Sequence, residues 1–216
     1  MRSRSLLLLA VSVAAACSRT PPLLSPDPRL LDATGPDSFS VIVKTSHGDF
    51  GLKIHRDWAP HGSDRLYYLF RARFYNDARF YRTVDNFITQ FGLSGDTAVS
   101  HAWRDRAIPD DPVRKNNTRG TVTFAMGGPN SRTTQLFINY RDNIRLDPLG
   151  FTVVGQVVAG MSVVDALYKG YGDGPPRGQG PAQERIRAEG NAYLARDFPR
   201  LDYILNARIE QEWRHR

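Results

Sequence analysis

The chain has 216 residues, of which 41% are hydrophobic and 11% aromatic, enough for one well-cored domain with appendages. Its formal net charge is +7, from 29 basic and 22 acidic residues, and only four of the basic residues are lysine. The basic residues are scattered, and no base-stacking motif or zinc-finger spacing accompanies them, so the sequence does not indicate nucleic-acid binding.

The first residues have the pattern of an export signal. Arg2 and Arg4 precede an apolar run, LLLLAVSVAAA at residues 6–16, which is too short to span a bilayer. We therefore expect residues 1–16 to be a signal peptide. Cys17 follows directly and is the only cysteine, which excludes an intrachain disulfide.

The segment VAAAC resembles the lipobox of bacterial lipoproteins, in which the cysteine is lipidated and becomes the mature N-terminus. The resemblance implies a lipidated Cys17 and an exported, periplasmic or cell-envelope protein that contacts the membrane through this lipid only. The alternative is cleavage at an Ala-x-Ala site, which would release a soluble periplasmic or secreted protein. Residues 17–37 contain five prolines and little periodicity, so we expect an extended tether.

The folded domain is predicted to cover residues 38–210. FSVIVKTSHGDFGLKIH, from Phe39, alternates in pieces and breaks at His47-Gly48-Asp49, which predicts a β-hairpin. Pro60 suits a first helical position, and apolar side chains recur at helical spacing beyond it, which predicts an amphipathic helix over residues 60–73. Five segments that follow have strand patterns: 79–84, 87–92, 121–125, 135–139 and 151–157. A second short helix is expected over residues 161–168.

The C-terminal part has three predicted segments. GYGDGPPRGQGP, residues 170–181, lacks the glycine spacing of a phosphate-binding turn and is expected to be a flexible connection. Residues 182–196 have a helical, charge-rich pattern. A last strand is predicted over residues 201–209, where Leu201, Tyr203, Leu205 and Ala207 alternate with Asp202, Ile204 and Asn206. Residues 211–216 are expected to be a basic tail.

Three segments contain unusual combinations of residues: FYRTVDNFITQ (80–90), TVTFAMGGPNSRTTQLFIN (121–139) and LDPLGFTVVGQVVAGMSVVDAL (146–167). Together they resemble the cyclophilin family of peptidyl-prolyl isomerases. The family's Phe-His-Arg strand reads Phe-Tyr-Arg here, its Gly-Pro-Asn turn is present, and its Gln-Phe-Phe-Ile strand reads Gln-Leu-Phe-Ile. The resemblance covers about residues 39–168 and the final strand.

The resemblance implies a mainly β fold: a closed antiparallel cyclophilin-like barrel capped by two helices. Residues 175–197 would be an extra helical insertion before the last strand. The implied function is cis–trans isomerisation of X–Pro bonds during folding of exported proteins, with proline-containing segments as partners. No cofactor and no metal are implied, and we expect a monomer. The alternative is a non-catalytic chaperone or scaffold that binds proline segments at the envelope.

The chemistry explains why an arginine suits such a site. An X–Pro bond has a small trans preference but a barrier of roughly 18–20 kcal/mol, so a catalyst must bind the twisted amide better than either planar isomer. The proline nitrogen becomes a hydrogen-bond acceptor in that state, and Arg82 is the implied donor. Gln90 would fix the guanidinium from behind. The alternative for Arg82 is a surface side chain whose stem covers apolar residues.

The remaining implied site residues bind the substrate. The matching positions for an apolar proline socket are Phe87, Ile88, Phe137 and Leu146, with Phe151 at the rim; each of these could instead be a core residue. The peptide backbone would contact Gln135 and the main chain at Ala125 and Met126. Met126 stands where the family usually has Asn, and Arg145 where many members have Trp.

Overall fold

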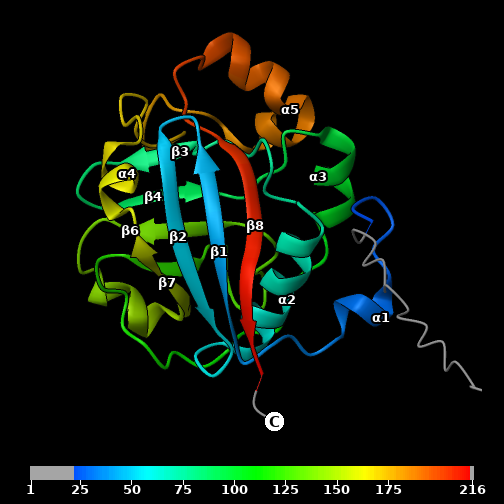
Figure 1. Cartoon of the computed structure of the whole chain (residues 1–216). Helices are drawn as coiled ribbons and strands as arrows, with labels where there is room; N and C mark the ends of the chain where they lie inside the picture. The colour runs from blue at the N-terminus through cyan, green and yellow to red at the C-terminus, as the bar shows by residue number, and fades with distance from the viewer. Residues whose placement is uncertain (1–21, 215–216) are drawn as a thin grey trace, which may run out of the picture.

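The computed structural model describes residues 22–214, so the predicted signal peptide and Cys17 lie outside the described residues. An antiparallel sheet of eight strands forms the body of the molecule, in the order β3-β4-β6-β5-β7-β2-β1-β8 (Figure 1). The strands are β1 (Ser38–Thr45), β2 (Gly48–His55), β3 (Arg82–Val84), β4 (Ile88–Phe91), β5 (Thr121–Phe124), β6 (Leu136–Asn139), β7 (Val153–Ala159) and β8 (Ile204–Trp213).

Helices lie around this sheet and at its ends (Figure 1). They are α1 (Pro28–Leu31), α2 (Pro60–Arg71), α3 (Thr97–Trp103), the 3-10 helix η1 (Ile144–Leu149), α4 (Met161–Ala166) and α5 (Gln183–Asp197). No helix in residues 22–214 combines the length and the apolar character needed to cross a bilayer. The prediction of a mainly antiparallel β fold with helices is confirmed.

The sheet curls, but its strand pairing does not run around a complete circle. β3 and β8 are its two edge strands, and the residues just before each of them meet. The amide of Phe80 donates to the carbonyl of Asp202 at 3.0 Å, and Arg79 forms an isolated bridge with Tyr203. The predicted full closure of the barrel is not seen in the strand pairing; among the described residues, the two edges meet through backbone hydrogen bonds between residues 77–80 and 202–204.

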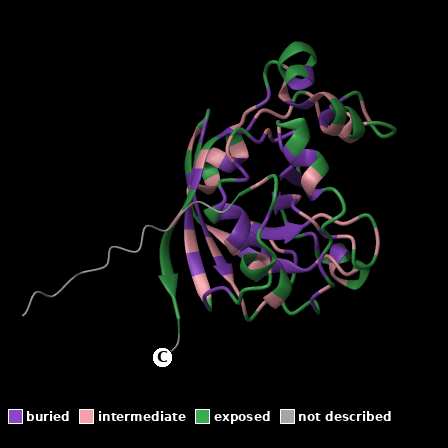
Figure 2. Ribbon diagram, turned by 90° about the vertical axis from the view of Figure 1, so that its right-hand side faces the viewer, coloured by how far each residue is buried: buried purple, intermediate pink, exposed green. Residues whose placement is uncertain are grey.

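The main core lies inside the curl and is rich in aromatic side chains. Leu66, Leu69 and Phe70 on α2 are buried there at helical spacing, as the sequence predicts. Figure 2 shows buried residues concentrated in the middle of the molecule. Pro60 is at the first helical position, but the N-cap, Ala59, has no side-chain acceptor. The carboxylate of Asp111 accepts instead from the amides of His61 and Gly62, both at 2.9 Å, which satisfies the free N–H groups of this helix end.

The segment predicted to be an extended tether is packed on the domain from residue 22 onward. The indole of Trp103 donates to the carbonyl of Leu23 at 2.9 Å, and the hydroxyl of Tyr68 donates to that of Pro22 at 2.8 Å. Both rings belong to the main core, and their polar atoms need an acceptor where they reach its surface. From residue 22 the segment is therefore docked on the domain and is not a free spacer.

The sequence pattern did not predict α3, and it assigned the wrong side chains of β8 to the buried face. The side chain of Asp96 caps α3 by accepting from the amides of Ala98 and Val99 at 2.8 and 3.2 Å, a signal that was present in the sequence. Along β8, Ile204 is fully buried while Leu205 is 55% exposed.

The reason for the phase shift is a β-bulge opposite β1. Lys44 pairs with Asn206 and Thr45 pairs with Ile204, so Leu205 is the extra residue and its side chain turns outward. β8 also continues to Trp213, so residues 211–213 belong to the strand and not to a basic tail.

The predicted insertion helix, α5, is anchored through one face. Ile186, Tyr193 and Leu194 form a second apolar cluster with Tyr81 and Leu93 of the sheet region. α5 also lies against α3 at the top of the view in Figure 1. The insertion therefore braces the segment that leads into β3.

The bulge predicts that substitutions at two neighbouring positions change the free energy of unfolding by very different amounts. Ile204→Ala should lower the free energy of unfolding by about 2–5 kcal/mol, because it empties a buried site. Leu205→Ala should change it by no more than about 0.5 kcal/mol, because that side chain faces solvent. Urea unfolding of both variants measures the difference. A larger loss for Leu205→Ala would show that the assigned phase of β8 is wrong.

Candidate active site

The antiparallel register of three short strands places the predicted catalytic residues in one row. Arg82 of β3 is directly opposite Gln90 of β4, which is directly opposite Phe137 of β6. Side chains at such positions lie on the same face of a sheet, about 4.5–5.5 Å apart at Cβ. The residues between them, such as Thr83 and Thr89, point to the other face, where their hydroxyls lie 2.9 Å apart.

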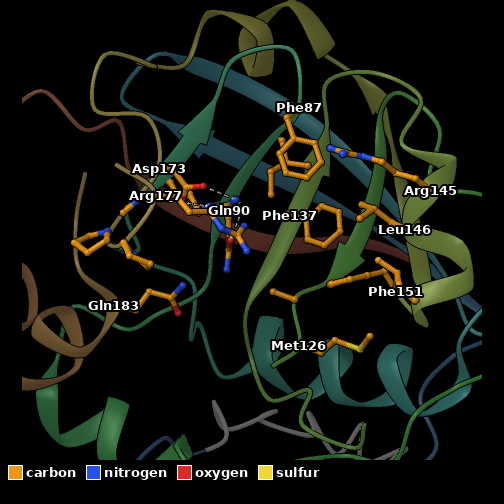
Figure 3. A pocket seen from close by; sticks show the side chains of 17 residues that line it. Phe87, Gln90, Met126, Phe137, Arg145, Leu146, Phe151, Asp173, Arg177 and Gln183 are labelled. Carbon is orange, nitrogen blue, oxygen red and sulfur yellow. Dashed lines mark hydrogen bonds and ion pairs between the residues drawn. The ribbon is translucent and has the colours of Figure 1, made fainter. Parts of the chain in front are cut away.

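This row forms one side of a cavity of about 710 Å³ on the outer face of the sheet (Figure 3). Every predicted site residue except Gln135 lines it: Arg82, Phe87, Ile88, Gln90, Ala125, Met126, Phe137, Leu146 and Phe151. The sequence had not assigned the other lining residues to the site: Arg145, Leu149, Asp173, Gly174, Pro175, Pro176, Arg177 and Gln183. The structure thus brings together segments that lie up to about a hundred residues apart in the chain.

The apolar part of the cavity is separate from the main core. Ile88, Phe137 and Leu146 form their own buried cluster, with Phe87, Ala125 and Phe151 packed against it. The rings of Phe137 and Phe151 meet edge to face, with centroids 5.9 Å apart. The neighbours of Phe137 in β6, Leu136 and Ile138, belong instead to the main core. These side chains therefore form a pocket wall, which the sequence could not distinguish from core.

Arg82 is held at the other side of the cavity by two partners. Its Nη1 donates to Oε1 of Gln90 at 3.1 Å. Its Nε and Nη2 donate to the two carboxylate oxygens of Asp173 at 2.7 and 3.0 Å, a bidentate pair. The side chains of Arg82 and Asp173 are only 13% and 22% exposed. The guanidinium therefore has a fixed orientation beside the apolar wall.

Asp173 is the principal site residue that the sequence missed. It lies in the glycine-rich segment 170–181, which was predicted to be a flexible connection. The hydrogen bonds from Arg82 lower the pKa of its carboxyl group below the ordinary value, so Asp173 is charged at neutral pH. Nothing in the local sequence signals a partner 91 positions away.

Gln135 does not line the cavity but supports it from behind. Its side-chain oxygen accepts from Nε2 of Gln90 at 3.1 Å and from the hydroxyl of Tyr81. Burial raises the pKa of Tyr81, which keeps that hydroxyl protonated and able to donate. Gln135 therefore orients Gln90, and its direct contact with the peptide stays a prediction.

The opposite wall is held by buried asparagines that the sequence analysis also missed. Asn117 donates from Nδ2 to the carboxylate of Asp147 at 2.7 Å and to the carbonyl of Phe151 at 2.8 Å. Asn143 donates to the carbonyl of Phe87 at 3.0 Å. These bonds fix η1 and the backbone on both sides of the apolar wall. Satisfied buried amides of this kind make a polar network rigid.

Two further arginines border the cavity. The guanidinium of Arg145 lies 4.9 Å from the ring centroid of Phe87, and that of Arg82 lies 5.8 Å from the same ring. Arg177 is exposed on the far side, in the loop that carries Asp173 (Figure 3). In residues 22–214, no cluster of three His, Cys, Asp or Glu side chains is placed to hold a metal ion. The cavity therefore offers hydrogen-bond donors, an apolar wall and positive charge.

The family model for cyclophilin type peptidyl-prolyl cis-trans isomerase/CLD matches residues 40–188, which include the whole row and both walls. The chain belongs to the cyclophilin-type peptidyl-prolyl cis-trans isomerase family. The match ends within α5.

Sequence comparison with individual proteins supports this family assignment. The chain is 32% identical over 133 residues to peptidyl-prolyl cis-trans isomerase-like 3 of Dictyostelium discoideum, covering 60% of this chain and 82% of that protein. It is 34% identical over 142 residues to a probable peptidyl-prolyl cis-trans isomerase of Brucella abortus (strain 2308), covering 61% and 72%.

Solved structures show the fold. A cyclophilin type isomerase of Cryptosporidium parvum superposes with a TM-score of 0.59 at 16% identity, covering 81% of this chain and 99% of that one. A second structure of that protein, determined in the presence of the dipeptide Ala-Pro, has a TM-score of 0.57. The expected cyclophilin fold is thereby confirmed.

The separate apolar cluster predicts which substitution affects ligand binding. Phe137→Ala should weaken binding of an Ala-Pro peptide about tenfold or more, since a buried phenyl ring contributes roughly 1.5–3 kcal/mol. Ile138→Val, on the core side of the same strand, should lower stability by about 0.5–1.5 kcal/mol and leave the dissociation constant unchanged. NMR titration of both variants compares them. Equal dissociation constants for Phe137→Ala and the unmodified protein would remove Phe137 from the binding wall.

Proposed function

We propose that the protein catalyses cis–trans isomerisation of X–Pro bonds in exported proteins during their folding. Family membership supports the reaction class. One observation supports the site: the fixed guanidinium of Arg82 shares a cavity with an apolar cluster that is separate from the core. Slow prolyl steps take tens to hundreds of seconds without catalysis, so such an activity has a use wherever proteins fold.

The proposed mechanism needs no covalent chemistry. Rotation about the X–Pro bond breaks the amide resonance, and the proline nitrogen regains a lone pair. The proline ring would lie against Phe137, Ile88 and Leu146, while Arg82 donates a hydrogen bond to that nitrogen. The donor is oriented before substrate arrives, so little reorganisation is needed in the transition state. The apolar wall excludes water, which strengthens the interaction.

The peptide backbone would lie along the end of β5. The amide of Ala125 already donates to the carbonyl of Gln135 at 2.9 Å. The carbonyl of Ala125 and the main chain of Met126 are therefore the groups at this edge that we assign to the peptide. The assignment does not depend on the side chain at position 126.

A second candidate function is binding of proline-containing segments without turnover. The bidentate pair with Asp173 favours it, because a neighbouring carboxylate reduces the positive potential that Arg82 presents to a substrate. In that case the cavity would serve a chaperone or scaffold. Only a rate measurement distinguishes the two functions.

Replacement of Arg82 tests the catalytic assignment. Arg82→Ala should slow isomerisation of an Ala-Pro peptide about a hundred- to a thousandfold, as loss of one preorganised donor does in oxyanion holes. Arg82→Lys should recover only part of the rate, since lysine keeps the charge but lacks the planar fork. NMR exchange spectroscopy measures the rate and a titration measures binding.

Two outcomes would contradict the proposal. An Arg82→Ala variant that isomerises the peptide at the unmodified rate would remove Arg82 from the mechanism. If neither form accelerates exchange while both bind the peptide, the protein is a binding module. The melting temperature of Arg82→Ala must be measured as well, because the change leaves Asp173 without its partner.

We also propose that the protein is a lipoprotein of the cell envelope, anchored through Cys17. The basic start, the short apolar run and the cysteine that follows it support the proposal. Mass spectrometry of the mature N-terminus should show an acylated Cys17 as the first residue. Cys17→Ser should abolish acylation and shift the protein from the membrane to the soluble fraction. A mature chain that begins elsewhere, with Cys17 unmodified, would contradict the anchor and favour a soluble exported protein.

A further inference from the structure

The segment GYGDGPPRGQGP, residues 170–181, is a folded part of the site. Gly172 forms a bridge with Thr83, the neighbour of Arg82 in β3, so the segment covers the free edge of that strand. The amide of Gly180 donates to the carbonyl of Asp173 at 2.8 Å. The segment is therefore tied both to the strand that carries Arg82 and to itself.

The glycines of this segment are explained by close packing around Asp173. A Cβ on Gly180 would lie 2.7 Å from the carbonyl oxygen of Tyr171 and 2.9 Å from that of Asp173. A Cβ on Gly178 would overlap the carbonyl oxygen of Asp173 as well. Since real Cβ atoms do not approach backbone oxygens so closely, the loop can fold this tightly only with glycine at these positions. Close packing by these glycines therefore fixes the backbone around Asp173.

Both oxygens of the Asp173 carboxylate accept hydrogen bonds. Its Oδ1 accepts from Nε of Arg82 at 2.7 Å and from the amide of Gly174 at 2.9 Å, while Oδ2 accepts from Nη2 of Arg82 at 3.0 Å. The bond to Gly174 fixes the carboxylate plane relative to the loop backbone. The plane of the guanidinium is in turn fixed by the two parallel bonds.

We propose that Asp173 is a positioning residue for the isomerase reaction: the loop 170–181 holds its carboxylate so that Arg82 is locked in the orientation that receives the twisted amide. This inference rests on the proposed function of Arg82. It extends the active site beyond the strand row to a segment on the other side of β3.

The donor count is compatible with this role. A guanidinium has five N–H groups: one on Nε and two on each Nη. Within the described residues, Asp173 uses the Nε–H and one on Nη2, and Gln90 uses one on Nη1. One N–H on each Nη is left for a substrate. Asp173 therefore fixes Arg82 without occupying the groups that the reaction needs.

For the reaction rate, we expect the gain from orienting Arg82 to outweigh the loss of positive potential that the carboxylate of Asp173 causes. The charge of Arg82 itself remains, because a guanidinium is not deprotonated in proteins. A misplacement of about 1 Å at a reacting group can cost on the order of a hundredfold in rate. An arginine that lost its bidentate partner would sample several rotamers and spend only part of its time in the productive one.

The experiment compares Asp173→Ala and Asp173→Asn with the unmodified full chain, using NMR exchange on an Ala-Pro peptide. Asp173→Ala should lower the rate at saturating peptide about tenfold and leave the dissociation constant within about twofold. Asp173→Asn keeps one acceptor and should retain an intermediate rate. The Nε–H of Arg82, which donates to Asp173, should exchange slowly with solvent in the unmodified protein and rapidly in Asp173→Ala.

Two controls make the test specific. Asp85→Ala removes the same charge from an exposed aspartate that pairs with Lys169 at 2.8 Å, and should leave the rate unchanged. The double variant Arg82→Ala/Asp173→Ala should be no slower than Arg82→Ala alone, because Asp173 acts only through Arg82.

The outcomes separate this inference from the proposed function. If Arg82→Ala abolishes acceleration but Asp173→Ala has the unmodified rate, the positioning role is wrong and the catalytic role of Arg82 stands. A faster Asp173→Ala variant would also overturn the inference, because it would show that the carboxylate inhibits. If Arg82→Ala keeps full activity, the proposed function of Arg82 fails first.

Discussion

The antiparallel register between β3, β4 and β6 is the constraint on which the site depends. It places Arg82, Gln90 and Phe137 in one row on the outer face of the sheet. Because side chains alternate along a strand, a slip of one residue in β3 would turn Arg82 into the aromatic core and Thr83 out to the cavity. A guanidinium in that core would have no carboxylate partner, so the slipped pairing is strongly disfavoured. The charge that serves the site thus also helps to specify the register that builds it.

Parts of the chain outside the three strands hold the row from both ends. At one end, α5 packs Ile186 and Tyr193 around Tyr81, whose hydroxyl reaches Gln135 and through it Gln90. At the other end, Asn117 and Asn143 fix the backbone of the apolar wall. The insertion is therefore connected to the row through Tyr81, and Gln183 of α5 also lines the cavity. The loop that leads to α5 adds the carboxylate on Arg82.

Periodicity and short motifs predicted most elements because their causes are local. Pro60 and the apolar spacing after it define α2, and the strand that contains Phe137 is evident from its own residues. Apart from α3, whose capping residue Asp96 was present in the sequence, the errors have causes elsewhere in the chain. Leu205 faces solvent because β1 imposes a bulge on its partner strand, and residues 22–37 are docked because Trp103 and Tyr68 need acceptors. Asp173 was missed because an ion pair between segments so distant leaves no pattern in either of them.

The same contacts determine how the site responds to protons. Its hydrogen-bond chain runs from Asp173 through Arg82, Gln90 and Gln135 to Tyr81, so its two ends are a carboxyl group and a phenol. The hydrogen bonds from Arg82 lower the pKa of Asp173 below its usual value near 4, and burial raises that of Tyr81 above its usual value near 10. Both shifts move the ends away from neutrality, so the carboxylate stays charged and the phenol stays neutral across the range between. A reaction that breaks no covalent bond needs no proton transfer, and a fixed pattern of donors and acceptors is what it requires. The partners that orient Arg82 are thus the same groups that keep this pattern constant.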